Sequence, residues 1–193
     1  NYIKTIKGVS LHLRGIEDQA FSLMRDGIEE LHQSGFEKEA LEFENNLAAL
    51  LIRSGYYQEG LELLEVAATR SGPGTSPDFA TYLWLNKAVA KLMSDRYDLD
   101  DILRDVQTGI SLAQERNFTI GKLFGYSVKA DVLSALGRWE EAEEILDHIM
   151  DPKYELIFNS QNDLSSYTNL VYGKISENQQ NWDEARSAYN WAI

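Results

Sequence analysis

Three histidines are the side chains whose chemistry the sequence offers first: His12, His32 and His148. Two imidazoles four residues apart on one helix would present a pair of zinc ligands. None of the three has another histidine at that spacing, and the one carboxylate that lies four residues from a histidine is Glu144, before His148. We therefore predict that the chain has no metal site and uses no cofactor.

Two acidic clusters suggest catalysis or calcium binding at first sight. Residues 140–144 hold four glutamates, and residues 98–101 hold three aspartates. Both clusters lie where a helix is expected to begin, and carboxylates at that place interact favourably with the positive end of the helix dipole. The aspartates also lack the central glycine and the closing glutamate of an EF-hand loop. We interpret both clusters as helix starts.

Other common catalytic elements are missing from the sequence. The chain has no cysteine, which excludes thiolate catalysis and disulfide bonds. Its glycine-containing stretch at 72–74 is not part of a Gly-Lys-Ser/Thr sequence, which is the element that binds nucleotide phosphates. We predict that the chain is not an enzyme.

Composition is that of an ordinary folded protein and argues against some partners. Of 193 residues, 44% are apolar, and 31 Asp and Glu against 18 Lys and Arg give a formal charge of −13. Such a charge repels nucleic-acid phosphates and anionic lipid headgroups. No stretch approaches the roughly 18 consecutive apolar residues of a membrane span. We predict a cytoplasmic segment of a longer protein that binds neither nucleic acid nor membrane.

A turn motif recurs at intervals of about forty residues. Three copies begin at Gly55, Gly137 and Gln180, and each has an aromatic residue two places later and a small residue three places after that. A weaker copy begins at Asp95 and keeps the aromatic residue. The four turns are separated by 40, 42 and 43 residues. A small residue stands seven places before each turn, at Ala48, Ala88, Ala130 and Gly173.

Small residues at a fixed place let a second helix approach closely, so each repeat is predicted to be two antiparallel helices. Apolar residues at a spacing of three and four, such as Phe43, Leu47 and Leu50, support helices beside the turns. The helices are expected near 18–33, 37–53, 57–70, 78–94, 97–116, 119–136, 139–150, 163–179 and 182–193. The repeats then cover about 37–74, 77–117, 119–156 and 163–193 of one domain spanning 1–193.

Local signals mark some boundaries of these helices. Ser76 and Pro77 are expected to be an N-cap and a first helical residue, after an exposed loop at 71–74. The longest connection is expected at 151–162. Residues 1–17 are left unassigned, because their apolar residues alternate as in a strand and yet also fit a helix.

The best repeat resembles the tetratricopeptide family. The residues that occupy the expected places in 123–156 are Tyr126, Ala130, Leu133, Gly137, Trp139, Ala142, Leu146 and Ile149. The repeats differ from that family in being longer than about 34 residues and in carrying polar residues at places that are usually apolar, namely Lys129, Asn169 and Ser176. In length they are similar to the divergent arrays of large bacterial transcription regulators and signalling ATPases.

This resemblance, which covers about 37–193, implies an all-α protein. Its architecture would be a right-handed α-solenoid of about four repeats of antiparallel helices, preceded by one N-terminal helix. In such arrays the first helices of successive repeats line a concave face that binds the partner. The residues implied at that face are Asn45, Ile52, Tyr82, Leu85, Phe124, Ser127, Asp131, Tyr167 and Lys174. The same residues could instead pack neighbouring repeats, and the sequence leaves both interpretations open.

The function expected from this fold is recognition without chemistry. The leading hypothesis is a regulatory scaffold that binds a partner protein, or another domain of its parent, through the concave face. The alternative is an array in a bacterial signalling or transcription regulator that senses a peptide or a small ligand. A third hypothesis is self-association through the C-terminal end, where an apolar helical face would be exposed.

Overall fold

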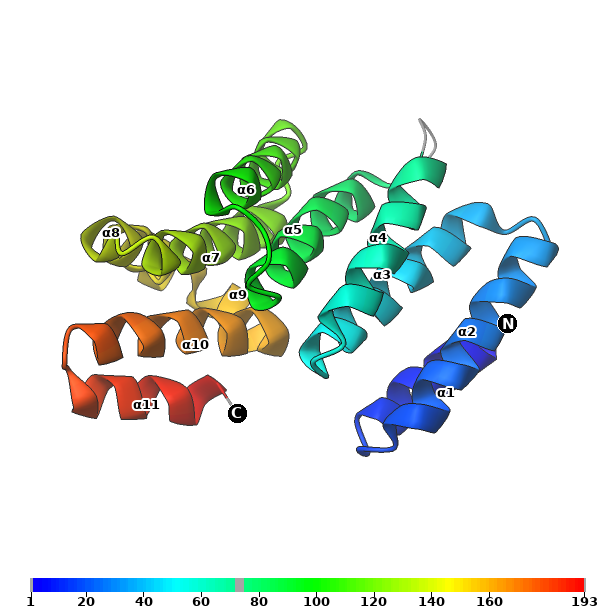
Figure 1. The fold of residues 1–193 in the computed structure, drawn as a ribbon, viewed down its shortest axis with the longest axis horizontal. Helices are drawn as coiled ribbons and strands as arrows, with labels where there is room; N and C mark the ends of the chain where they lie inside the picture. Colours follow the sequence, from blue (N-terminus) through cyan, green and yellow to red (C-terminus); the bar gives the residue numbers. More distant parts are fainter. Residues whose placement is uncertain (1, 72–74, 193) are drawn as a thin grey trace. The chain divides into compact units, whose positions relative to one another are not determined.

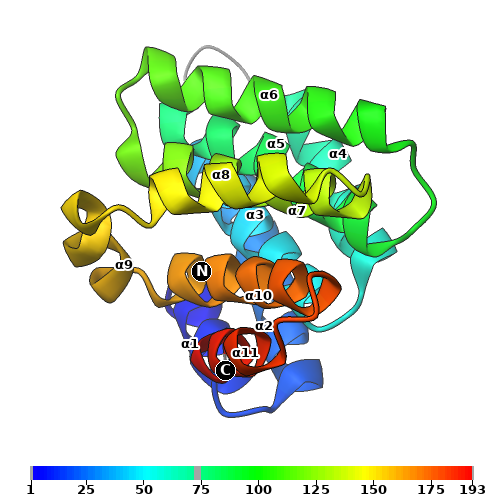
Figure 2. The ribbon, with the colours of Figure 1, turned by 90° about the vertical axis from the view of Figure 1, so that its left-hand side faces the viewer.

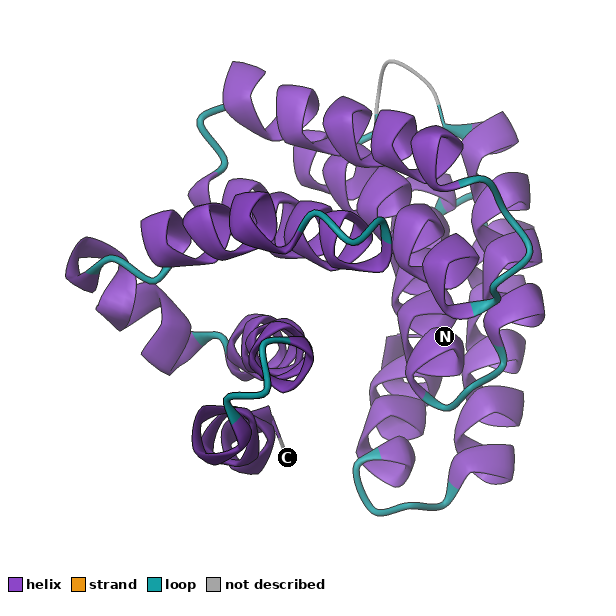
Figure 3. Cartoon of the chain, turned by 60° about the vertical axis from the view of Figure 1, so that its left-hand side comes forward, coloured by secondary structure: helices purple, strands orange, loops and turns teal. Residues whose placement is uncertain are grey.

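The computed structural model describes residues 2–71 and 75–192, and this part of the chain is all-helical (Figure 1). Helices joined by short turns account for nearly all of it, and the described stretches contain no β-strand (Figure 3). Each helix packs against the one that follows it within its compact unit. The predicted all-α class is therefore confirmed.

The contacts of the chain divide it into two compact units, Asn1–Ser94 and Asp95–Ile193. The first contains α1 (Tyr2–His12), α2 (Glu17–Gln33), α3 (Glu37–Arg53), α4 (Tyr57–Arg70) and α5 (Pro77–Met93). The second contains α6 (Leu99–Glu115), α7 (Thr119–Ala135), α8 (Trp139–Ile149), a 3-10 helix (Pro152–Tyr154), α9 (Glu155–Ser160), α10 (Asn162–Asn178) and α11 (Trp182–Ala192). The nine predicted helices are confirmed, with ends that differ by no more than two residues. That a single domain spans both units stays a prediction.

Each recurring turn is built around one residue in the left-handed backbone region. Its φ is 88° at Gly55 and 74° at Gly137, as glycine allows. Asp95 and Gln180 adopt the same conformation, with φ of 51° and 63°, although they carry side chains. The turn is therefore conserved in backbone shape among the repeats even where its glycine is not.

Two glycines mark close approaches of paired helices. At Gly8 of α1, an added Cβ would lie 2.3 Å from the side chain of Met24 on α2. At Gly173, an added Cβ would lie 2.5 Å from the ring of Tyr189 on α11. Figures 1 and 2 show α10 and α11 running side by side in opposite directions. These contacts support the predicted antiparallel pairing of helices.

One helix was missed by the sequence analysis, because residues 1–17 were left unassigned and only one N-terminal helix was expected. Residues Tyr2–His12 form α1, which packs against α2. Part of the repeat pattern was present there. Gly15 lies 40 residues before Gly55, Gly8 lies seven places before Gly15, and the buried Ala20 lies five places after Gly15, but Glu17 replaces the aromatic residue. The backbone of Gly15 is also left-handed, with φ of 73°. The pair α1–α2 therefore repeats the small residues and the turn of the motif.

The first compact unit has two apolar clusters, which together join α2, α3, α4 and α5. Leu41 of α3 packs with Leu61 and Leu64 of α4 and with Leu83 of α5. A second cluster joins α2 to α3 and contains Phe21, Met24, Ile28, Leu47, Leu50 and Leu51. Burial of each such side chain contributes about 1.5–3 kcal/mol, so packing between consecutive helices stabilises this unit.

The second compact unit has its core at the meeting of α7, α8 and α10. Leu123 and Leu133 of α7 pack with Leu146 of α8 and Val171 of α10. The half-buried Ile157 and Phe158 of α9 pack against the same cluster. The expected long connection at 151–162 is therefore not a plain loop, since it folds into the 3-10 helix and α9 and covers part of this core.

Two expected helix caps are confirmed. The Ser76 hydroxyl accepts a hydrogen bond of 3.2 Å from the backbone N–H of Phe79 at the start of α5. The Asp98 carboxylate accepts bonds from the N–H groups of Asp100 and Asp101, which makes this acidic cluster a helix start. Most of the expected loop at 71–74 lies outside the described residues.

Candidate functional site

The nine residues predicted to line a binding face all lie on first helices, but five of them are buried. Asn45 and Ile52 on α3, Leu85 on α5, and Ser127 and Asp131 on α7 are at most 5% exposed. Their side chains pack between helices and offer a partner no contact surface in this conformation. The interpretation that these five residues pack neighbouring repeats is therefore the one their burial favours.

Two of the buried residues form polar pairs between consecutive first helices. The Asn86 amide on α5 donates a hydrogen bond of 3.1 Å to the side-chain oxygen of Asn45 on α3. The hydroxyls of Ser127 on α7 and Thr168 on α10 are 2.8 Å apart. A buried polar group without a partner costs about 1–3 kcal/mol, so these pairs favour one register of the facing helices.

Asp131 is the centre of a polar cluster between α7 and α10. Its carboxylate accepts a hydrogen bond of 2.9 Å from the Tyr167 hydroxyl and bonds of 2.9 and 3.1 Å from the Lys174 ammonium. The Phe124 ring meets the Tyr167 ring edge to face, with centroids 5.7 Å apart. Burial, and then the charge and hydrogen bond of Asp131, raise the pKa of Tyr167 well above its usual value.

The other four predicted residues are partly exposed. Tyr82 lies on α5 in the first compact unit. Phe124, Tyr167 and Lys174 lie together in the second unit, and each is half-buried. We call these three residues the α7–α10 surface. It combines two aromatic rings, which pack against the core of this unit, with one ammonium group. Aromatic contact area beside a charge is a combination that protein interfaces commonly use.

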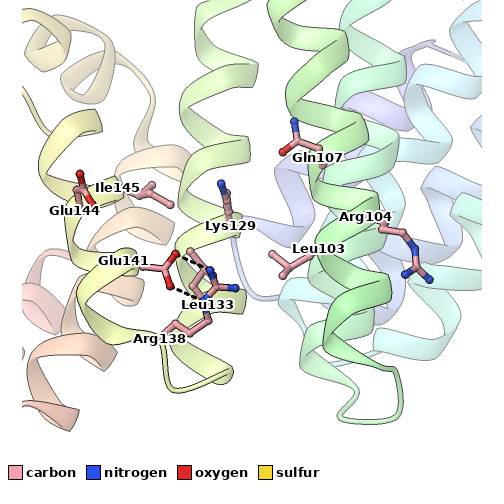
Figure 4. A pocket seen from close by; sticks show the side chains of 9 residues that line it. All are labelled: Leu103, Arg104, Gln107, Lys129, Leu133, Arg138, Glu141, Glu144 and Ile145. Carbon is pink, nitrogen blue, oxygen red and sulfur yellow. Dashed lines mark hydrogen bonds and ion pairs between the residues drawn. The ribbon is translucent and has the colours of Figure 1, made fainter.

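A pocket of about 530 Å³ lies among α6, α7 and α8 (Figure 4). We call it the α6–α8 pocket. Its apolar lining comes from Leu103, Leu133 and Ile145. Its polar lining comes from Arg104, Gln107, Lys129, Arg138, Glu141 and Glu144. The mixture of an apolar surface and charged groups is typical of sites that bind small ligands.

Lys129 lies on α7, which stands between α6 and α8 in Figure 4. Arg138 is held by Glu141 through two hydrogen bonds of 2.6 Å. The pKa of Glu141 is lowered, chiefly by the hydrogen bond from Arg138 and to a smaller extent by the charge of Lys129. Among the described residues, no group forms a hydrogen bond or ion pair with the Lys129 ammonium. One signal in the sequence marks this residue, namely its polar type at a place that is usually apolar.

A second group of charges lies in the first compact unit. His32 on α2 has Nδ1 2.6 Å from a Glu37 oxygen, and its Nε2 lies 2.9 Å from both a Glu44 oxygen and the Arg70 Nη1. The same Glu44 oxygen accepts a bond of 2.8 Å from Arg70. Burial lowers the pKa of His32, but the bonds with Glu44 and Glu37 outweigh it, so this pKa lies above its usual value. Sequence reasoning searched for partners at helical spacing and missed these two, which come from the next helix.

The described residues contain neither a metal-binding cluster nor a helix that could cross a membrane. No group of three or more His, Asp or Glu side chains among them is arranged to hold a metal ion. Among the same residues, no helix combines the length and apolar character that crossing a membrane requires. Comparison of the chain with models of protein families and with curated proteins found no match.

Proposed function

We propose that this chain is a non-catalytic interaction module that binds a partner protein, or another domain of its parent, through the α7–α10 surface. The observation that carries the proposal is the edge-to-face pair of Phe124 and Tyr167 beside the Lys174 ammonium, with all three side chains half-buried. Aromatic side chains supply large contact areas at interfaces, and a neighbouring charge gives direction to the contact. Asp131 fixes both Tyr167 and Lys174, so this surface is ordered before a partner arrives.

We also infer that the helix pairs belong to an α-solenoid of the tetratricopeptide type. The support is that first helices of consecutive repeats contact each other in both compact units, as α3 with α5 and α7 with α10. Each of these contacts includes a buried polar pair. Repeated contacts between neighbours are the defining property of repeat proteins.

Affinity capture from an extract of the cells that produce the chain tests the binding proposal. The immobilised chain is compared with Phe124→Ala, which removes one aromatic edge of the α7–α10 surface. The matched control is Tyr126→Ala on the same helix, whose hydroxyl accepts a bond of 3.1 Å from Gln114 of α6 and so faces a different neighbour. We expect a protein that is retained by the native chain and by Tyr126→Ala but lost by Phe124→Ala. Equal retention by all three would contradict a role for this surface.

A second candidate function is a sensor of a small anionic ligand, of the kind expected in a signalling or transcription regulator. The observation that favours it is the α6–α8 pocket, whose Lys129 ammonium has no bonded partner among the described residues. A panel of small mono- and dicarboxylates, tested by thermal shift, would detect such a ligand. A saturating ligand at 100 times its dissociation constant stabilises a protein by about 2.7 kcal/mol. Loss of the shift in Lys129→Gln would support this function, and absence of any shift would leave the interaction module as the better proposal.

A further inference from the structure

The first helices of consecutive repeats contact one another through side chains that precede the small residue. Counted from the small residue of each first helix, Phe43 and Thr168 lie five places before it and Asn86 lies two places before it. Each contacts the preceding first helix: Phe43 meets Tyr2 with ring centroids 5.7 Å apart, Asn86 bonds to Asn45, and Thr168 bonds to Ser127. The places five and two before the small residue therefore form the side that faces the preceding first helix.

On α1 these two places are occupied by Ile3 and Ile6, and no preceding helix covers them in the described chain. Ile3 is 80% exposed and Ile6 is 61% exposed. On α5 and α10 the first of these places is buried, since Leu83 is 3% exposed and Thr168 is 1% exposed. On α3 the two places hold Phe43, which is half-buried, and Asn46, which is exposed. The side of α1 that matches a helix-binding side elsewhere in the chain is thus open and apolar.

The exposed side of α1 is also cationic. Lys7 follows Ile6, and Leu13, which is 75% exposed, is followed by Arg14. The spacing of three, four and seven residues brings these side chains to one stripe of the helix and its following turn. Residues 2–15 contain no Asp or Glu, although the chain as a whole carries a formal charge of −13. We define the α1 face as Ile3, Ile6, Lys7, Leu13 and Arg14.

We propose that the α1 face binds an acidic amphipathic helix, which lies along α1 where a preceding first helix would lie. Apolar side chains of this partner helix, spaced by three and four residues, would cover Ile3, Ile6 and Leu13. Asp or Glu side chains beside its apolar stripe would meet Lys7 and Arg14, because complementary charges fix the register of a bound helix. Two copies of the chain do not satisfy this chemistry through α1 alone, since their Lys7 and Arg14 side chains would face like charges. The site is separate from the α7–α10 surface and does not depend on it.

Fluorescence anisotropy with a synthetic helical peptide tests this proposal on the full chain. The probe is a labelled peptide of about 15 residues, with leucines at three-and-four spacing flanked by glutamates. A peptide of the same composition in scrambled order serves as the first control. We expect saturable binding of the ordered peptide alone, and absence of binding would overturn the proposal.

Variants locate the binding on the chain. Ile3→Ser/Ile6→Ser should weaken binding at least about tenfold, because two apolar contacts are lost. The matched control is Leu156→Ser on α9, which removes a leucine that is 84% exposed in the other compact unit. Circular dichroism should show the same helix content in both variants, since the replaced side chains are exposed. Equal loss of binding in Leu156→Ser, or none in the isoleucine variant, would overturn the proposal.

A charge exchange tests the acidic character of the partner. Lys7→Glu/Arg14→Glu should weaken binding of the glutamate-flanked peptide and restore binding of a peptide in which lysines replace the glutamates. Failure of this exchange would contradict the charge part of the proposal. Sedimentation of the chain alone provides the last check: self-association that disappears in Ile3→Ser/Ile6→Ser would assign the α1 face to a second copy and overturn the proposal.

Discussion

Lys174 on α10 and Asp131 on α7 form an ion pair between two first helices, with the ammonium nitrogen 2.9 and 3.1 Å from the carboxylate oxygens. Asp131 is buried, whereas Lys174 reaches solvent. A buried carboxylate that loses its partner is left without compensation for its lost hydration. The packing of α7 against α10 therefore depends on the charge of Lys174.

Removing that charge should destabilise the second compact unit. For Lys174→Gln we expect a loss of about 2 kcal/mol in the free energy of unfolding, measured by urea denaturation. Lys153→Gln is the control, because its pair with Asp151 is exposed and such pairs contribute little to stability. The double variant Asp131→Asn/Lys174→Gln should recover part of the loss, since no buried charge then remains. A loss of the same size in Lys153→Gln would refute this account.

Gly173→Ala should destabilise the pairing of α10 with α11. The new methyl group would lie 2.5 Å from the Tyr189 ring, which must move. Overpacking of this kind costs about 1–3 kcal/mol, and a gain of about 1 kcal/mol in helix propensity partly offsets it. In a Tyr189→Ala background the obstructing ring is absent, so Gly173→Ala should become neutral or stabilising. A double-mutant cycle measures the difference, and additivity of the two changes would contradict the close approach.

Replacing Asp95 or Gln180 by glycine should stabilise the turn that contains it. Both residues have positive φ, which costs a residue with a side chain about 1 kcal/mol relative to glycine. Gln180→Gly should therefore raise the free energy of unfolding by up to about 1 kcal/mol. The neighbouring Gln179 has φ of −78°, so Gln179→Gly should have the opposite sign. Thermal unfolding of the two variants side by side distinguishes them.

Stability of the first compact unit should depend on the protonation of His32. Its pKa is raised in the folded chain, because hydrogen bonds with Glu44 and Glu37 outweigh the effect of burial. The charged imidazole therefore stabilises the fold below the unfolded pKa of about 6.5, and this contribution is lost as pH rises through the higher folded pKa. The free energy of unfolding of the native chain should fall as pH rises through this range. That of His32→Gln should not show this fall. NMR titration of the His32 ring gives the folded pKa, and a value below 6.5 would reverse the sign.

The repeat pattern predicted nine helices from local signals. Small residues before each turn, an aromatic residue after it and apolar spacing act within one helix pair, so they can be recognised without knowing the rest of the fold. The small residues were also present at Gly8, Gly15 and Ala20, but Glu17 stands at the place of the aromatic residue. The apolar residues of 1–17 fit both a strand and a helix, so α1 was not assigned. The position of these residues within the repeat indicates the helix better than the alternation of apolar residues does.

The candidate site was predicted less well, and the reason is geometric. Periodicity assigns Asn45, Ser127 and Asp131 to one side of their helices, but it does not say how closely the next first helix approaches that side. The approach is close enough for hydrogen bonds of 2.8 to 3.1 Å, so these side chains are buried. The same limit concealed Glu37 and Glu44 beside His32, since the partners come from another helix.

The sequence by itself determined that this chain forms pairs of helices, where each pair turns and which small residues lie between them. Those properties depend on interactions between residues that are near in sequence, so the spacing of residue types indicates them. Only the tertiary structure decided which sides of the first helices are covered and which are open. Ile3 and Leu83 occupy the same place in their repeats, yet one is 80% exposed and the other 3%, because burial depends on which helices of the described chain pack against that place.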